Sequence, residues 1–204
     1  MGENSGYWLL AIGGGFLAGS ILFSRWIPRF FLGKDVTELS DDRNPGASNV
    51  FIHCGPLWGM LCLLLDVLKG FLPVYLAVRY LDTESLWFGL AMAAPVLGHG
   101  IAPFHHFHGG KCISTAFGCL LALLPVSPIV LVLAVLYILF STVLKISPNR
   151  LRSIAAFGLF GLISLAVLAH EQQYSLAVGC TLISLTAIWK HSRHAMEQTC
   201  KAVP

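Results

Sequence analysis

The sequence predicts an all-α integral membrane protein with about seven transmembrane helices. Of its 204 residues, 56% are hydrophobic and 11% are charged, and the mean hydropathy is +0.74. Soluble domains carry roughly 25% charged residues, so this composition excludes a soluble, a disordered or a collagen-like chain. No repeat, linker or low-complexity tract divides the sequence, and we therefore expect a single membrane-embedded domain over residues 1–204.

Apolar windows along the chain define the predicted spans. A transmembrane helix needs about 20 mostly apolar residues, and the fourth, fifth and sixth windows are shorter than this. Pro125 and Pro128 predict a tight turn between the fourth and the fifth window. The second window is expected to continue beyond Gly70 as a broken segment that is kinked at Pro73. The predicted spans lie near residues 7–27, 50–68, 86–104, 113–124, 129–144, 154–168 and 174–189.

The distribution of basic residues predicts the orientation of these spans. If the N-terminus is outside, all of the 13 Lys and Arg residues except Lys69 and Arg79 fall in the inner loops or in the C-terminal tail. Because cytoplasmic loops are enriched in Lys and Arg, we expect the N-terminus outside and the C-terminus in the cytoplasm. No basic residue precedes the first apolar run, which predicts a first span and not a cleaved signal peptide.

Residues 43–49 form the first of three unusual inner segments. A Pro-Gly pair in this segment favours a turn that leaves backbone N–H groups unpaired. Amide and hydroxyl side chains add donors at the start of the next helix, where the helix dipole favours an anion. An ordinary helix-capping turn is the alternative interpretation. The candidate binding residues are Arg43, Asn44, Gly46, Ser48 and Asn49.

The second segment, residues 98–111, contains another candidate anion-binding loop. The adjacent Gly109 and Gly110 allow the backbone to come close to a ligand, and Lys111 supplies a point charge of the kind that holds phosphate. The spacing differs from that of a nucleotide-binding P-loop. His99 lies nearer the apolar third span, where an ionisable group is costly and is therefore a functional candidate. The alternative is a hydrogen-bonded histidine between helices.

Three further histidines in this segment do not have the spacing of metal ligands. His106 and His108 are two residues apart, which does not place two ligands on one helix face, and neither they nor His105 is followed by a carboxylate ligand. We therefore expect neither a metal nor a cofactor. The six cysteines also lack a metal-binding spacing, and most lie in apolar runs where a free thiol is expected.

The third segment comprises residues 148–153 together with the tail at 190–194. Each part is a cluster of basic residues after an apolar run, and membrane anchoring by positive charge is an alternative to a binding role. Asp66 and Lys69 form an i, i+3 pair near the end of the second span. Charges in that position are costly unless they are paired, so we expect an ion pair, with substrate contact as the alternative.

Two phosphate-type loops and several histidines at the cytoplasmic membrane surface favour an enzyme over a channel. Such an enzyme would act on a phosphorylated, partly lipid substrate, and nothing in the charge pattern indicates a nucleic acid. The sequence has no G-x-S-x-G motif, which disfavours a covalent acyl-enzyme. Direct transfer between two bound substrates is therefore favoured.

At these residues the chain resembles the bacterial acyl-phosphate:glycerol-3-phosphate acyltransferases, the PlsY family. The resemblance covers nearly the whole chain, and the motifs occur in the family's order and spacing. They are GSILFS at 19–24, NPGASNV at 44–50, DVLKG at 66–70 and the run from GH at 98–99 to HGGK at 108–111, followed by Ser114 and Thr115.

This resemblance implies transfer of a fatty acyl group from acyl phosphate to glycerol 3-phosphate, giving lysophosphatidate, in a bacterial plasma membrane. It implies contact with the lipid bilayer and functional coupling to an enzyme that forms acyl phosphate. The active site would face the cytoplasm. The implied catalytic residues are His99, Lys111, Ser153 and His191, and the implied substrate-binding residues are Asn44, Gly46, Ser48, Asn49, Gly109 and Gly110. Arg43, which departs from the family pattern, is a further candidate that would restore positive charge from a shifted position.

Departures from the family pattern keep two alternatives open. The family's Arg after Asn-Val falls on Ile52, and its Ser-Gly before Asn-Pro-Gly is replaced by residues 41–43, Asp-Asp-Arg. One alternative is a divergent paralogue that binds a phosphorylated lipid or uses another acceptor. The other is a small transporter, for which Asp66, Lys69 and His99 in apolar segments are the motivation.

Overall fold

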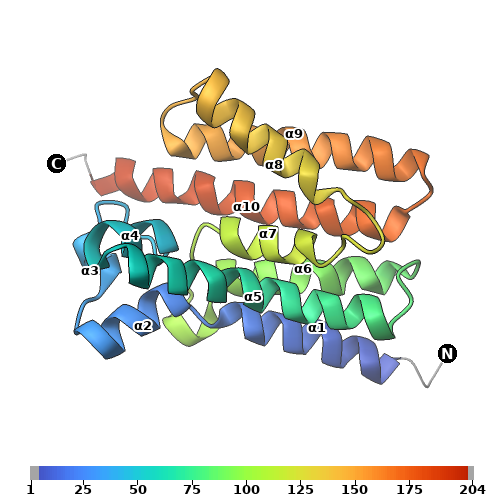
Figure 1. The fold of residues 1–204 in the computed structure, drawn as a ribbon, viewed down its shortest axis with the longest axis horizontal. Coiled ribbons are helices and arrows are strands. Elements are labelled where there is room, and N and C mark those ends of the chain that lie inside the picture. The colour runs from blue at the N-terminus through green and yellow to red at the C-terminus, as the bar shows by residue number, and fades with distance from the viewer. Residues whose placement is uncertain (1–4, 202–204) are drawn as a thin grey trace.

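The protein is a bundle of helices that lie roughly along one long axis (Figure 1). The computed structural model describes the backbone of residues 5–201 and the side chains of residues 5–193. Within residues 5–201 there are only helices, turns and loops, which confirms the all-helical class. The elements are α1 (Ser5–Ser20), α2 (Phe23–Leu32), α3 (Val36–Leu39), α4 (Ala47–Cys54), α5 (Pro56–Tyr80), α6 (Leu86–Ile101), the 3-10 turn η1 (Pro103–His105), α7 (Ile113–Leu121), α8 (Val130–Ile138), the π-helical turn η2 (Leu139–Val143), α9 (Asn149–His170) and α10 (Tyr174–Lys201).

Several helices have the length and composition of membrane spans. Among the described residues, α5, α9 and the segment Leu86–His105 each qualify by themselves, and α1 with α2 forms a fourth candidate that is bent by 43°. The prediction that the sixth span is short is wrong, because α9 has 22 residues and begins at Asn149. Its first turn is polar and basic, so the apolar pattern did not reveal it.

The first and second predicted spans have different boundaries in the structure. The first is interrupted at Ile21 and Leu22, where the hydroxyl of Ser20 bonds back to the carbonyl of Phe16 at 2.7 Å, a contact that bends helices. The second begins at Pro56 and not at residue 50, because Gly55 with φ 90° separates α4 from α5. Helix α5 then continues unbroken past Pro73 to Tyr80, so the predicted break is wrong.

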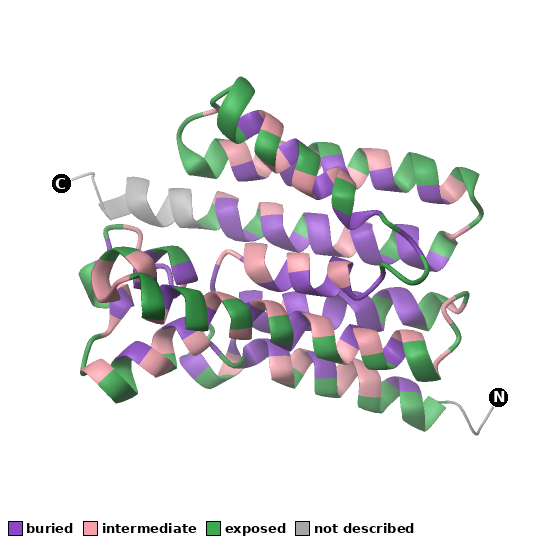
Figure 2. Ribbon diagram, viewed as in Figure 1, coloured by how far each residue is buried: buried purple, intermediate pink, exposed green. Residues whose placement is uncertain are grey.

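Helix α7 lies in the middle of the bundle and is too short to cross a bilayer alone. Its nine residues rise about 14 Å, against about 30 Å of hydrocarbon. Most of its side chains are buried, as Figure 2 shows for the centre of the molecule. The count of seven spans therefore stays a prediction.

Glycines allow the central helices to pack with their backbones in contact. A Cβ atom on Gly19 would lie 2.0 Å from the carbonyl oxygen of Pro95, and one on Gly98 would lie 2.0 Å from that of Phe16. Both contacts join α1 to α6, and Gly118 brings α7 equally close to α5. Small residues at such crossings are typical of helix packing in membranes, where close van der Waals contact replaces the hydrophobic effect.

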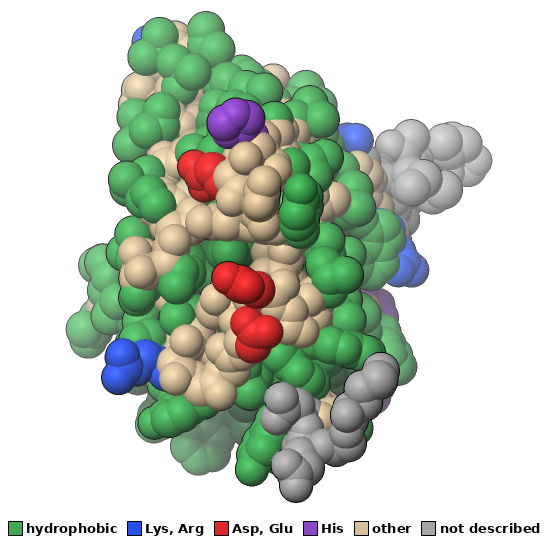
Figure 3. All heavy atoms as spheres, turned by 90° about the vertical axis from the view of Figure 1, so that its right-hand side faces the viewer, with side chains coloured by type: hydrophobic (Ala, Val, Ile, Leu, Met, Phe, Trp, Pro, Cys, Tyr) green, Lys and Arg blue, Asp and Glu red, His purple; other side chains and the backbone are tan. Residues whose placement is uncertain are grey.

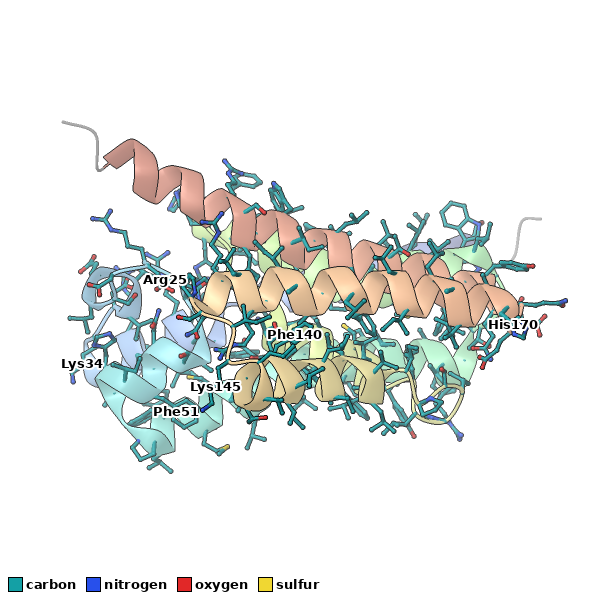
Figure 4. The ribbon with its side chains drawn as sticks, turned by 90° about the horizontal axis from the view of Figure 1, so that it is seen from above. Arg25, Lys34, Phe51, Phe140, Lys145 and His170 are labelled. Atoms are coloured by element: carbon teal, nitrogen blue, oxygen red, sulfur yellow. The ribbon has the colours of Figure 1, made fainter. Side chains whose placement is uncertain are left out.

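The two ends of the bundle differ in charge. Helix α1 begins at the end opposite to the one where α10 ends (Figure 1). The end that carries the α5–α6 and α9–α10 turns shows a few acidic side chains among apolar ones (Figure 3), from Asp82, Glu84 and Glu171. Figure 4 shows Arg25 and Lys34 at the other end, far from His170. Basic side chains thus lie at the α2 end of the bundle, together with the carboxylates of Asp35 and Asp42 that pair with some of them.

Candidate functional site

The predicted inner segments meet at one end of the bundle. The start of α4, the loop at residues 102–112, the start of α9 and the later turns of α10 all lie at the end near Arg25 and Lys34 (Figures 1 and 4). Segments up to about 150 residues apart in the sequence are therefore neighbours. Together they form the candidate site.

The first loop is held in shape by its own asparagines. The side-chain amide of Asn49 donates to the carbonyl oxygen of Asn44 at 2.8 Å, and both residues are buried. The side-chain Nδ2 atom of Asn44 packs against Gly46, and a Cβ added to Gly46 would lie 2.4 Å from it. Its Oδ1 atom is buried without a hydrogen-bond partner among the described residues. Ser48 is exposed at the first turn of α4, so this loop presents polar groups as well as capping a helix.

The paired glycines of the second loop pack against the end of α6. A Cβ on Gly109 would lie 2.2 Å from the carbonyl oxygens of His99 and Gly100, and one on Gly110 would lie 2.4 Å from Nε2 of His99. The N–H of Gly110 donates to the carbonyl oxygen of His99 at 3.2 Å. These glycines therefore seat the loop on the protein's own backbone. Because the backbone N–H of Gly110 already donates to His99, we expect Lys111 to be the main ligand-binding donor of this loop.

Lys111 joins the second loop to the first. Its Nζ atom lies 2.5 Å from Oδ2 of Asp42, and both side chains are half-buried. Oδ1 of Asp42 accepts from Nδ2 of Asn49 at 2.8 Å and from the backbone N–H of Asn44 at 3.1 Å. Burial opposes ionisation of Asp42, but the hydrogen bonds from Lys111 and Asn49 and the Lys111 charge outweigh it and hold the pKa of this carboxyl below its ordinary value. Asp42 is therefore an ionised carboxylate inside the site.

Beneath the second loop, the buried Lys69 on α5 connects three helices. Its Nζ lies 2.8 Å from Oδ1 of Asp66, 2.5 Å from the carbonyl oxygen of Ile21 and 2.7 Å from Nδ1 of His99. The ammonium thus makes two hydrogen bonds, to the carbonyl of Ile21 and to His99, and an ion pair with Asp66. Ser24 donates to the other oxygen of Asp66 at 2.8 Å. The predicted Asp66–Lys69 ion pair is confirmed, and it also satisfies the carbonyl freed where α1 ends.

The contact with Lys69 determines how His99 can act. Lys69 donates to Nδ1, so a neutral imidazole carries its proton on Nε2. Nε2 is directed at Gly110, next to Lys111. His99 can therefore donate a hydrogen bond toward the loop, whereas the nitrogen that could accept a proton is occupied. The alternative of an interhelical histidine is also met, since His99 links α5 to α6.

The third predicted segment is less closely connected to the first and second loops than these loops are to each other. Ser153 is buried and donates to the carbonyl oxygen of Asn149 at 3.1 Å, within the first turn of α9. His191 is buried on α10. The same helix approaches the end of α6 through Lys190, whose Cγ lies 3.4 Å from the position of a Cβ on Gly100. Arg43 is exposed, whereas Asn44 and Asn49 are buried.

The three histidines after η1 do not converge. His105 is buried, whereas His106 and His108 are exposed. In the part of the chain that the structure describes, no three His, Cys, Asp or Glu side chains come together as metal ligands. The five cysteines whose side chains are described are free thiols, and Cys200 lies outside the described side chains.

A surface pocket beside α2 was missed in the sequence. It has a volume of about 360 Å³ and combines basic and aromatic side chains, a lining suited to an anionic amphiphile. Asp35, which caps α3, holds Arg25 at 3.1 Å and so fixes one wall. The i, i+4 spacing of Arg25 and Arg29 was a signal for one basic helix face. The pocket is lined by Arg25, Trp26, Arg29, Phe30 and His105.

Comparison with known proteins identifies relatives over almost the whole chain. Residues 9–199 match the model of a family described as glycerol-3-phosphate acyltransferase. Glycerol-3-phosphate acyltransferases of Hydrogenobaculum sp. and Pseudoalteromonas translucida are 35% and 38% identical, over 87% and 86% of this chain and 86% and 81% of theirs.

Solved structures give the same result. The crystal structure of PlsY, an integral membrane glycerol 3-phosphate acyltransferase, in its glycerol 3-phosphate form superposes with a TM-score of 0.79 at 27% identity. The lysophosphatidic acid form gives 0.76 at 26% identity. Each comparison covers 96% of this chain and 93% of the other.

Proposed function

The chain belongs to the glycerol-3-phosphate acyltransferase family, and on this premise we propose that it transfers a fatty acyl group from acyl phosphate to glycerol 3-phosphate. It is a multi-pass membrane acyltransferase of phospholipid synthesis. The proposed products are lysophosphatidate and inorganic phosphate. The observation that carries the donor assignment is the contact of Lys111 with the first loop, which unites two anion-binding segments 69 residues apart.

We assign the phosphate of the acyl phosphate to the site that the first and second loops form together. Lys111 supplies the positive charge, and the backbone of Gly109 lies beside it. On the first loop, side chains and backbone amides at the start of α4 supply neutral donors. The first-loop residues in this role are Asn44, Gly46, Ser48 and Asn49, with Gly110 supporting the second loop and Arg43 adding charge at the rim.

The proposed reaction is a direct acyl transfer. The first hydroxyl of glycerol 3-phosphate attacks the carbonyl carbon of the mixed anhydride, a C–O ester bond forms, and the bond from that carbon to the phosphate oxygen breaks. The departing phosphate accepts the hydroxyl proton, so the step balances without a separate base. Because the acyl group is already activated, orientation of the two substrates and stabilisation of the departing phosphate supply most of the rate enhancement. No metal or other cofactor takes part in this scheme.

His99 is proposed as a hydrogen-bond donor and not as a general base. Its Nδ1 is bonded to Lys69, and its protonated Nε2 is directed at Gly110. It can orient the second loop or a substrate oxygen beside that loop. Ser153 and His191 are proposed to bind the glycerol 3-phosphate, since both lie on helices that end or begin at the same end of the bundle.

We also propose that this end faces the bacterial cytoplasm, with seven crossings and the N-terminus outside. Support comes from the opposite positions of the start of α1 and the end of α10 (Figure 1) and from the basic side chains of Arg25 and Lys34 at this end (Figure 4). A single domain over residues 1–204 stays a prediction, supported by a core that includes Trp8 on α1 and Ala187 on α10. Coupling to an enzyme that forms acyl phosphate is a further prediction.

The experiment is a reconstitution with purified protein in detergent, palmitoyl phosphate and glycerol 3-phosphate, without added metal. We expect equal amounts of lysophosphatidate and phosphate. Lys111→Ala should abolish turnover without affecting insertion, whereas Lys34→Ala should be active, because the exposed Lys34 donates to the carbonyl oxygen of His53 and not to the first or second loop in the part of the chain that the structure describes. Wild-type turnover in Lys111→Ala would refute the assigned role. A folded protein without product would favour a divergent binder, and substrate flux into sealed vesicles would favour a transporter; the comparisons favour neither.

A further inference from the structure

The anion site already contains an anion that belongs to the protein. The two oxygens of Asp42 take up three donors: Nζ of Lys111 at 2.5 Å, Nδ2 of Asn49 at 2.8 Å and the backbone N–H of Asn44 at 3.1 Å. An ammonium, a side-chain amide and a backbone amide are the kinds of donor that bind phosphate oxygens. In this structure the carboxylate of Asp42 occupies the place where the proposed function puts the substrate's phosphate.

A phosphate cannot share this site with Asp42 at low energetic cost. The carboxylate is ionised and half-buried, and it neutralises the charge of Lys111. Like charges brought together away from water repel strongly, so an incoming phosphate must either face that repulsion or remove the carboxylate. Both Nδ2 hydrogens of Asn49 are also in use, one by Asp42 and one by the carbonyl oxygen of Asn44.

The part of the chain that carries Asp42 is suited to move. Residues 41 and 42 form a short turn between α3 and α4, and neither belongs to a helix. The contact between Asn49 and Asn44 spans the first loop without Asp42 and stays in place when the Asp42 side chain leaves. The donors that Asp42 gives up, on Asn49, on the backbone of Asn44 and on Lys111, are then available to the phosphate.

We propose that Asp42 is an internal competitor for the phosphate site, which closes the site in the unliganded protein and which the substrate's phosphate displaces. This inference rests on the proposed function, because it concerns the same site. The exchange sets selectivity, since a phosphate dianion can replace the carboxylate and keep Lys111 neutralised, whereas a weakly charged anion gains less. It also reduces the apparent affinity by the fraction of time for which the site is open.

The neighbouring Asp41 provides a matched control. It has the same charge, lies in the same turn and is exposed, and no described side chain pairs with it. Asp41→Asn and Asp42→Asn therefore change the net charge equally, but only the second removes the competitor of Lys111. A difference between the two variants separates displacement from a general effect of charge.

The test measures binding of inorganic phosphate to the full-length protein in detergent by the shift in its melting temperature. Relative to wild type, we expect the half-saturating phosphate concentration to fall about tenfold in Asp42→Asn and to stay within about twofold in Asp41→Asn. Asp42→Ser, which has a shorter side chain, should behave as Asp42→Asn does, and it serves as the second variant if Asp42→Asn does not fold. Inhibition of turnover by phosphate should strengthen in parallel.

Other outcomes overturn this inference. Equal tightening in Asp41→Asn would show a general effect of charge, and unchanged or weaker phosphate binding in both Asp42 variants would show that Asp42 only positions Lys111. Because phosphate binding is measured without turnover, the result does not depend on the acyltransferase assay. An inactive protein that still shows the shift would refute the proposed function alone, and an active protein without the shift would refute the displacement alone.

Discussion

The ammonium of Lys69 lies 2.7 Å from Nδ1 of His99, although the two residues are 30 positions apart and on different helices. The Nζ atom of Lys69 also contacts Asp66 and the carbonyl oxygen of Ile21, where α1 ends. A single buried cation therefore fixes the break after α1, the tautomer of His99 and, through His99, the position of the second loop.

Replacing Lys69 should destabilise the fold. Lys69→Met leaves the carboxylate of Asp66 buried without its cation and the carbonyl of Ile21 without a donor, and breaking a buried pair in this way costs about 3–5 kcal/mol. We expect a clear drop in melting temperature in detergent. Lys34→Met, at an exposed lysine, is the control and should change it little. A stable Lys69→Met would contradict the central role of this cation.

Substitution of His99 should distinguish a role as hydrogen-bond donor from a role as general base. His99→Gln can retain an N–H donor near the position of Nε2, whereas His99→Phe keeps the ring volume and loses both nitrogens. We expect kcat to fall about 10-fold in the first variant and at least about 100-fold in the second, with the pH profile of the first matching wild type. Loss of one limb of the profile in His99→Gln would instead identify His99 as a general base.

The glycine turn above His99 should not tolerate a side chain. In Gly110→Ala the new Cβ would lie 2.4 Å from Nε2 of His99, which must shift together with Lys111. We expect little activity and a lower melting temperature. Gly158→Ala on α9 is the matched control, because a Cβ there meets nothing within 4 Å, and it should be neutral or stabilising. Normal kcat in Gly110→Ala would show that the loop position does not matter for the reaction.

An arginine at position 52 should increase activity. Ile52 is 70% exposed on α4, one turn from Ser48 on the same face. Ile52→Arg therefore adds a charged donor near the first loop without disturbing the core, and stability should change by less than about 0.5 kcal/mol. We expect a severalfold lower KM for a phosphate-bearing substrate, with Ile52→Gln as the uncharged control. Identical kinetics in both variants would show that this face does not reach the substrate.

Acid should weaken the ion pair between Asp35 and Arg25, which holds one side of the pocket beside α2. Burial opposes ionisation of Asp35, but hydrogen bonds from Thr37 and the charge of Arg25 outweigh it and lower its pKa below the ordinary 3.8. A carboxyl with a lowered pKa in the folded state stabilises the protein above pH 3.8, and this contribution is lost as the pH falls through its folded value. Between pH 6 and about pH 3, the melting temperature of wild type should therefore fall more than that of Asp35→Asn. Parallel curves would contradict this.

Composition and local sequence patterns determined the class of the protein and indicated two loops of its candidate site. The apolar windows identified membrane helices because a bilayer requires long apolar segments, and α6 begins at the predicted residue. The two loops were identified because Pro-Gly, Gly-Gly and Lys in these orders produce donors and charge locally. Asp66 and Lys69 were paired correctly because they are one helical turn apart on α5.

The tertiary structure decided what depends on contacts between distant segments. The continuity of α5 through Pro73, the length of α9 and the break after α1 depend on packing and on the contact between Lys69 and Ile21, which no local window contains. The same holds for Asp42, which appeared only as a substitution in the family pattern. Its meeting with Lys111 requires the whole bundle to fold, because electrostatic interaction depends on distance in space and not on separation along the chain.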